Sequence, residues 1–309
     1  MSGGHPRGRL HRTPRRVLHR PRRGIGTVGL VIVGGFAVIA AIGGFIAPYR
    51  TTALVGQSLE APSAQHLLGT NVLGQDVWSQ MLSGTRVSLF MALVAGGGTL
   101  LLGTVVGTLA GWVGGRTDAV LMRAVDLVMV IPGLPLLIVL GAYVGPSLAA
   151  VAIVIALISW PHGARVVRAQ VLSLRNRAHL RASVGFGAST VHVLRRHILP
   201  EIGLILVSGL VGSAGRAVAI AAGLAFLGLG DPVQASWGSV MRDALNYRSL
   251  FATPAWEWWL VPPIVALVVF LLGLTFVGMS FEERLNPRLE RHRLAHQRPA
   301  HQTGGEAGA

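Results

Sequence analysis

The residue types that usually carry catalysis are scarce or scattered in this chain. It has no cysteine, which excludes disulfides, thiolate metal sites and cysteine nucleophiles. It also lacks a G-x-x-x-x-G-K-[ST] phosphate loop, an H-E-x-x-H metal motif and a G-x-S-x-G motif. The 11 histidines fall mostly near the chain ends and in residues 162–197, without paired metal spacing. We therefore expect a non-catalytic chain that binds no metal or cofactor itself, with a membrane enzyme as the weaker alternative.

Arg216 is the charge that lies deepest within an apolar stretch, residues 202–225. A charge at such a depth costs at least about 2.5–3.5 kcal/mol on insertion scales, so it usually faces a cavity or a partner. Two interpretations stay open: Arg216 faces a transport path, where it meets a carboxylate or a carbonyl group, or it contacts a second subunit. Elsewhere, the three-residue spacing of Arg123 and Asp126 predicts an ion pair on one helix.

The stretch from Asn176 to Ile202 carries a different pattern. We expect residues 178–184 and 188–198 to be helical, with apolar Val191, Leu194 and Ile198 on one face and Pro200 ending the pattern. A solvated basic linker is the plainer interpretation, but it does not explain a concentration of small residues that lets another backbone approach closely. We expect this segment to dock into a groove on a cytoplasmic partner. The small residues are Ala182, Ser183, Gly185, Gly187, Ala188 and Ser189.

The elements that must position these residues are membrane spans. Of the 309 residues 51% are hydrophobic and only 13% are charged, and mean hydropathy is +0.58. A soluble domain has about 25% charged residues. Because only helices satisfy their own backbone in lipid and about 20 apolar residues cross it, we predict an all-α protein with six spans. The spans are 25–47, 87–113, 119–144, 147–164, 202–225 and 258–281.

The arginines fix the expected orientation. All 27 basic residues are arginine, against 12 acidic residues. Segments 1–24, 114–118, 165–200 and 282–309 alternate onto one face and hold 21 arginines, whereas the loops on the opposite face hold three. The positive-inside rule then places both termini in the cytoplasm of a multi-pass cell-membrane protein. The same distribution of arginines indicates that the basic arm 1–24 contacts anionic lipid and does not bind nucleic acid. Trp256, Trp258 and Trp259 are expected to anchor the outer interface.

Several motifs, in order along the chain, resemble those of ABC importer permeases of the oligopeptide, dipeptide and nickel family. Residues 66–77, HLLGTNVLGQDV, resemble its HPLGTDxLGRDV, and residues 84–89, GTRVSL, resemble GARVSL. Residues 224–230 with 236–238, LAFLGLG and SWG, resemble LSFLGLG and SWG, and residues 286–289, NPRL, resemble the DPRL of the C-terminal permease type. Arg181-Ala182-Ser183, Gly187 and Leu199-Pro200 resemble the E-A-A-x-x-x-G … L-P loop. The resemblance covers about residues 25–290.

This resemblance implies a type I ABC importer permease fold in which residues 181–189 form a coupling helix. That helix inserts into a cleft of an ATPase subunit, with Gly187 at a turn that glycine adopts easily. The family's first Glu is Arg181 here and its second Ala is Ser183. The reversed charge implies either a matching acidic residue on the ATPase or weaker coupling. A third alternative is that other contacts compensate for the change at this position. ATP and Mg²⁺ are expected on the ATPase subunits.

The resemblance also implies the partners. These are a second homologous permease, two ATPase subunits, and an extracytoplasmic solute-binding protein that docks on loops 49–85 and 226–257, with transport by alternating access. We expect a basic arm (1–24), a permease domain (25–281, with its core at 87–281 and its coupling loop at 165–200) and a cytoplasmic tail (282–309). Peptides are the expected substrate, and nickel or another small solute remains open. A secondary transporter is less favoured because no internal repeat is visible.

Overall fold

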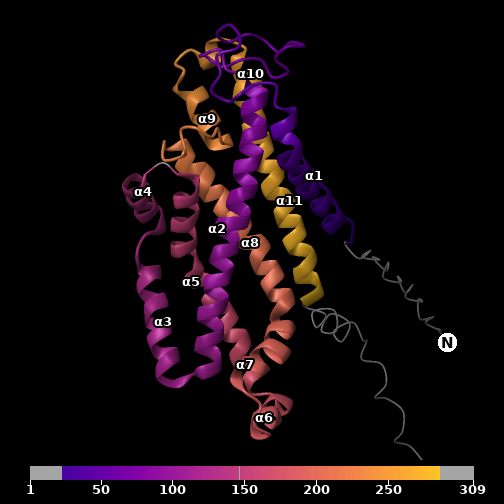
Figure 1. Ribbon diagram of the computed structural model, residues 1–309, viewed down its shortest axis with the longest axis vertical. Coiled ribbons are helices and arrows are strands. Elements are labelled where there is room, and N and C mark those ends of the chain that lie inside the picture. The colour runs from indigo at the N-terminus through magenta and orange to yellow at the C-terminus, as the bar shows by residue number, and fades with distance from the viewer. Residues whose placement is uncertain (1–22, 146, 286–309) are drawn as a thin grey trace, which may run out of the picture.

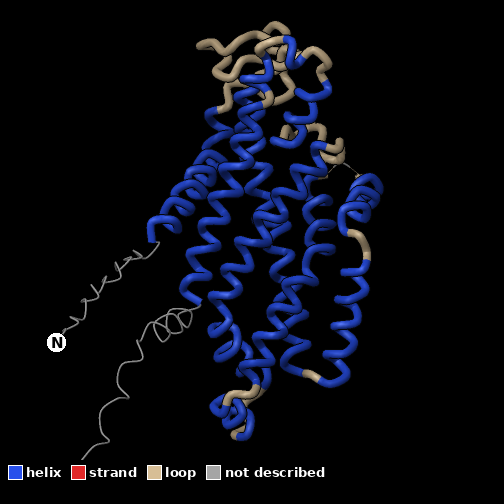
Figure 2. Tube along the Cα trace, turned by 180° about the vertical axis from the view of Figure 1, so that it is seen from behind, coloured by secondary structure: helices blue, strands red, loops and turns tan. Residues whose placement is uncertain are grey.

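The computed structural model describes residues 23–145 and 147–285, and within these ranges the chain is helical and has no β-strand (Figures 1 and 2). The long helices are α1 (Arg23–Ile46), α2 (Val77–Val113), α5 (Leu148–Arg175), α8 (Leu199–Phe226) and α11 (Val261–Leu285). The shorter elements are α3 (Gly115–Val130), α4 (Gly133–Val144), α6 (Ala178–Gly185), α7 (Thr190–Val193), the π-helical turn η1 (Leu194–Ile198), α9 (Trp237–Asn246), the 3₁₀ turn η2 (Leu250–Ala252) and α10 (Ala255–Trp259).

The long helices form one elongated bundle around α2, which packs against α5 and α8 (Figure 1). Helices α1 and α11 lie side by side on one flank, and α3 and α4 lie on the other. Residues 47–76 and 227–260 gather at one end of the bundle, here called the cap end, and α6 lies at the opposite end. Five segments are long and apolar enough to cross a membrane, and the bent pair α3–α4 makes a sixth. The described part of the chain therefore matches a six-span protein.

Glycines let α2 approach α5 closely enough for their backbones to touch. A Cβ atom added to Gly107 would lie 2.4 Å from the carbonyl oxygen of Ala164, and one at Gly103 would lie 3.0 Å from that of Trp160. One turn further along, a Cβ at Gly111 would lie 2.9 Å from the Cβ of Val171. This four-residue spacing of small residues is a common way to pack helices in lipid, where burying apolar surface gives little driving force.

The third predicted span, 119–144, is wrong as a single straight helix. Helices α3 and α4 meet at an angle of 84°. Between them Ile131 is extended (φ −74°, ψ 128°) and Pro132 follows it. Proline disfavours the helical conformation in the preceding residue and has no N–H for the helix. The helix therefore breaks here, although the apolar sequence continues through the break.

Several helices extend beyond the predicted spans, because hydropathy locates the apolar part of a helix and not its ends. Helix α2 begins ten residues before the predicted Val87. Helix α5, which contains Pro161, continues eleven residues past the predicted end at Ala164. Proline 200 does not end the helix as predicted, since Thr190–Phe226 runs as one helical segment. Residues 1–22 and 286–309 lie outside the described residues, and with them most of the predicted arm and tail and the NPRL motif.

Candidate functional site

Residues 176–189, here called the α6 loop, are held between α5 and α8 by a small hydrophobic core of their own. Leu180 of α6 is fully buried there together with Val171 and Leu174 of α5 and Ile202 of α8. An ion pair between Arg177 and Glu201 adds a second link, from the start of α6 to the start of α8. Helix α6 is therefore attached to two spans at once, although it lies at the tip of the molecule (Figure 1).

Gly187 ends α6 in a left-handed conformation, with φ +86°. The N–H of Gly187 donates to the Val184 carbonyl at 3.0 Å, and the N–H of Ala188 donates to the Ser183 carbonyl at 3.1 Å. This pair of bonds is the Schellman arrangement, which favours glycine at the left-handed residue. The expected glycine turn at position 187 is confirmed.

The predicted small-residue surface is present and open. Arg181, Ala182, Gly185, Gly187 and Ser189 are exposed, Ser183 and Ala188 are partly buried, and at the base Leu199 is partly buried and Pro200 exposed. Phe186, which was not predicted from the sequence, has a side chain that is 92% exposed beside the Gly187 turn. The sequence feature that could have identified Phe186 is an apolar residue between two glycines in a polar loop. Arg181 is not free to swing outward entirely, since its Nη2 donates to Oδ1 of Asn176 at 2.9 Å.

The predicted inward face of residues 188–198 is partly wrong. Val191 is 59% exposed, whereas Val193, which was not predicted to face inward, is fully buried with Ile198. The cause is the π-turn η1, in which the Leu199 N–H bonds to the Leu194 carbonyl five residues back. Proline 200 has no N–H to continue the four-residue ladder, and the wider turn shifts the buried face by one residue.

Two ion pairs join α3 to α5 near the α6 end of the bundle, and one of them corrects a prediction. Asp126 pairs with Arg165 at 2.5 Å, and not with Arg123 on its own helix. Arg168 donates through Nε and Nη2 to both carboxylate oxygens of Asp118, at 2.5 and 2.6 Å. The spacing of Arg123 and Asp126 was compatible with a local pair, but a cross-helix arginine lies closer.

Arg216 lies on the exposed face of α8, next to Gly212. No carboxylate within the described ranges lies within ion-pair distance of it. Its neighbours Ser213 and Ala217 point the other way and are buried, and the Ser213 hydroxyl donates to the Gly96 carbonyl of α2 at 2.9 Å. The guanidinium of Arg216 is thus directed out of this chain, toward lipid, a path or a partner.

The HLLGTNVLGQDV, GTRVSL, LAFLGLG and SWG motifs meet at or beside the cap end, where the residues described here have structural roles. Asp76 caps α2 by accepting from the Ser79 N–H at 2.8 Å, and its other oxygen lies 3.1 Å from Nδ1 of buried His66. Trp237 of the SWG motif fits over Gly84 and donates through Nε1 to the Met81 carbonyl at 3.3 Å. Gly238 is equally constrained, because an added Cβ would lie 2.1 Å from the Ala222 carbonyl of α8.

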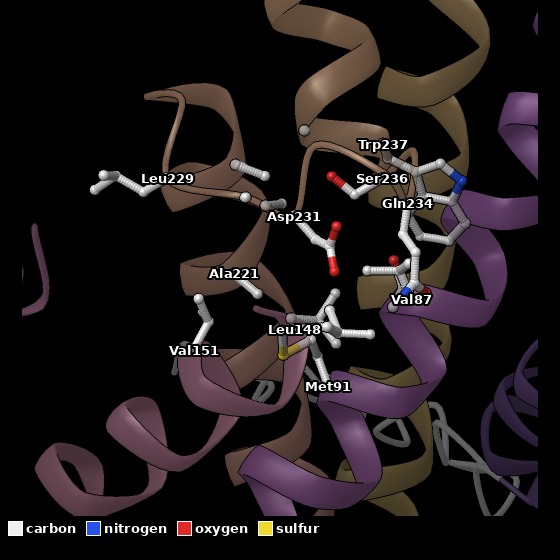
Figure 3. A pocket seen from close by; sticks show the side chains of 16 residues that line it. Val87, Met91, Leu148, Val151, Ala221, Leu229, Asp231, Gln234, Ser236 and Trp237 are labelled. Carbon is white, nitrogen blue, oxygen red and sulfur yellow. The ribbon is translucent and has the colours of Figure 1, made fainter. Parts of the chain in front are cut away.

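Two cavities lie at this end and share one carboxylate, Asp231. The inner cavity, of about 30 Å³, is enclosed by α2, α5, α8 and the loop after α8, and is lined mainly by apolar side chains (Figure 3). The outer cavity, of about 380 Å³, opens between residues 51–80 and residues 228–243 and has a polar lining. Asp231 was not predicted from the sequence, because an acidic residue after the LAFLGLG stretch is typical of an ordinary turn.

The bundle of apolar spans defines a class, a multi-pass cell-membrane protein, and its likeness to a solved structure gives it the type I ABC importer permease fold. In structure it is similar to a chain of the methionine ABC transporter MetNI in an inward-facing conformation, with a TM-score of 0.53 over 69% of this chain and 95% of that chain, at 18% identity.

Sequence comparison narrows the class to a family. The model for the inner membrane component of binding-protein-dependent transport systems matches residues 103–291, and the chain belongs to this family. A Brucella suis protein named as a peptide permease is 39% identical over 74% of this chain and 76% of its own length. A second Brucella suis protein, named for a peptide transport system permease, is 34% identical over 90% and 92%. The dipeptide transport system permease DppC of Bacillus subtilis is 33% identical over 85% and 82%.

Proposed function

We propose that this chain is the non-catalytic permease subunit of an ATP-driven importer of di- and oligopeptides, with both termini in the cytoplasm. The observation that carries the substrate class is the similarity, over most of the chain, to proteins named for peptide or dipeptide transport. The excess of arginine in segments that alternate onto the α6 side supports the orientation, with the cap end outside.

A transporter of this kind needs partners that this chain does not supply. Within the proposal a second, homologous permease completes the path, and two ATPase subunits bind ATP and Mg²⁺ on the cytoplasmic side. A solute-binding protein delivers peptide to the cap end. ATP-driven closure of the ATPase pair opens the path outward, and hydrolysis returns it to the inward-open state.

The α6 loop is the proposed contact with an ATPase subunit. Its exposed small residues allow close approach, and Phe186 offers an apolar anchor of the kind that dominates interface energetics. Leu180 shares a packed core with α5 and α8, so a push on α6 moves both spans together. Arg181, where the family pattern has Glu, is oriented by Asn176 and is proposed to meet an acidic residue of the ATPase.

Arg216 is proposed to face the transport path. Arg216 points away from the packed core of this chain and has no ion-pair partner among the described residues. It lies on α8, the helix that joins the α6 loop to the cap end. An Arg216→Ala variant that assembles normally but transports poorly is the expected result. Loss of assembly with the second permease would instead make Arg216 an interface residue.

The subunit composition tests the proposal as a whole. Gentle detergent purification of the tagged chain from its native host, with mass spectrometry of the co-purifying proteins, is expected to recover an ATPase with a phosphate loop and a second permease. A chain that deletes residues 178–189 is the matched control and is expected to lose the ATPase but keep the permease. Recovery of the intact chain alone would favour a secondary transporter.

A further inference from the structure

Asp231 sits where the two cavities of the cap end meet. Gly230, Asp231 and Gln234 line both of them, in the loop that follows α8. The side chain points into the inner cavity, toward Val87 of α2 and Leu148 of α5 (Figure 3). Its position is fixed by the end of α8, where Gly228 adopts φ +91° and the Leu229 N–H returns to the Leu224 carbonyl.

This carboxylate has no cationic partner in the described part of the chain. Oδ1 accepts from the Val233 N–H at 2.9 Å, and no arginine or histidine nitrogen there lies within ion-pair distance. The chain has 27 arginines for 12 acidic residues, and four other carboxylates are each paired with an arginine: Asp118, Asp126, Glu201 and Asp243. Even Arg242, which also lines the outer cavity, pairs with Asp243 and not with Asp231.

The residues around Asp231 indicate which chemical class of ligand would bind there. Met91, Leu148 and Val151 provide apolar walls, and Ser88, Gln234 and Ser236 provide neutral polar groups. A partly buried anion in such a setting is costly unless a cation approaches it. No group of three His, Asp or Glu side chains able to hold a metal ion occurs among residues 23–145 and 147–285. A single carboxylate with hydroxyl and amide neighbours suits a primary ammonium, which has three N–H donors beside carbon, better than a transition metal.

We propose that Asp231 binds the free ammonium group of the cargo as it enters from the cap end, and that it thereby favours peptides with an unblocked N-terminus. This inference deepens the proposed function and rests on it for the identity of the cargo. It assigns Asp231 to substrate selection and leaves ATP hydrolysis and subunit assembly to other residues.

The natural absence of cysteine allows a direct test in intact cells that express the complete transporter. A Gln234→Cys reporter, placed at the junction of the cavities, is labelled from outside with a cationic and an anionic methanethiosulfonate of similar size. The ratio of the two labelling rates is compared with and without Asp231→Asn. Asp231→Glu, which keeps the charge, and Glu257→Gln, which removes an exposed cap-end charge outside both cavities, are the controls.

We expect the cationic reagent to react roughly tenfold faster relative to the anionic one when Asp231 is present, as one nearby charge gives in partly screened surroundings. Asp231→Asn is expected to abolish this preference, and both controls to retain it. Saturating dialanine is expected to slow labelling only while Asp231 is present, and N-acetyl-dialanine is expected not to slow it.

A preference unchanged by Asp231→Asn, or equal protection by the two peptides, would overturn the proposal. An Ala221→Cys reporter in the same cavity repeats the measurement if Gln234→Cys reduces expression. Uptake of labelled dialanine in the same cells distinguishes failure of the ammonium site from failure of the proposed peptide import. A preference that depends on Asp231 without peptide uptake would retain the ammonium site and reject the peptide importer.

Discussion

At the scale of single residues, the conformation of Gly187 makes the sharpest prediction. A side chain in the left-handed region costs about 1–2 kcal/mol, so Gly187→Ala is expected to raise local opening of the α6 loop roughly 5- to 30-fold. Hydrogen exchange at the Gly187 and Ala188 amides, which donate to Val184 and Ser183, measures this opening.

Gly185→Ala is the matched control for this substitution. Gly185 lies in α6 without positive φ, and an added Cβ would meet no atom within 4 Å. It is expected to leave exchange unchanged or to slow it slightly, because alanine favours helix. Equal effects of the two substitutions would show that the turn does not require glycine.

Phe186 supports a second prediction at this scale. Phe186→Ala is expected to weaken binding of the chain to its ATPase subunit by at least about tenfold, since buried aromatic anchors commonly contribute 2 kcal/mol or more. Titration of detergent-solubilised permease pair with purified ATPase measures the affinity. Phe251→Ala, at a phenylalanine of the cap end that is 70% exposed, is expected to have no effect. Comparable losses from both variants would reject Phe186 as the anchor.

Sequence reasoning found residues whose role depends on local backbone and missed those whose role depends on distant neighbours. Gly187 could be placed at a turn through its resemblance to the glycine of the family's loop, and glycine adopts such a turn easily. The partner of Asp126 could not, because Arg165 is 39 residues away in the chain. Asp231 lacked any local signal, since its significance arises from cavities formed by α2, α5 and α8.

At the scale of helices, the close packing of α2 and α5 predicts a position-dependent response to added volume. Gly107→Val would drive a side chain into the Ala164 carbonyl and is expected to cost about 1–3 kcal/mol, as overpacking usually does. The expected result is a lower melting temperature and a loss of monodisperse protein in size-exclusion chromatography. Gly97→Val, on the same helix with no atom within 4 Å of its Cβ, is expected to behave like the native chain.

The number and approximate place of the spans followed from hydropathy, but their breaks and ends did not. The turn at Ile131-Pro132 lies inside an unbroken apolar run, and only its backbone geometry reveals an 84° bend. The opposite error occurred at Pro200, which was expected to end a helix and is instead accommodated by the π-turn η1. A proline indicates a perturbed helix, and tertiary packing decides whether the perturbation is a bend or a wider turn.

At the scale of the whole molecule, the proposed orientation predicts which surfaces a membrane-impermeant reagent reaches. Single cysteines at Val233, in the cap end, and at Gly185, in the α6 loop, can be introduced into a chain that has none. In intact cells, maleimide labelling is expected at Val233→Cys alone, and at Gly185→Cys only after permeabilisation. The reverse pattern would place the arginine-rich segments outside.

The central claim is that this chain forms the path of an ATP-driven peptide importer. Its most direct test is uptake of radiolabelled dialanine into proteoliposomes that contain the purified complex, with ATP inside and the solute-binding protein outside. The account predicts uptake that requires ATP, continues when proton and sodium gradients are collapsed, and is not reduced by an excess of nickel ions. Uptake driven by an ion gradient without ATP, or ATP-dependent uptake of nickel and not of dialanine, would contradict it.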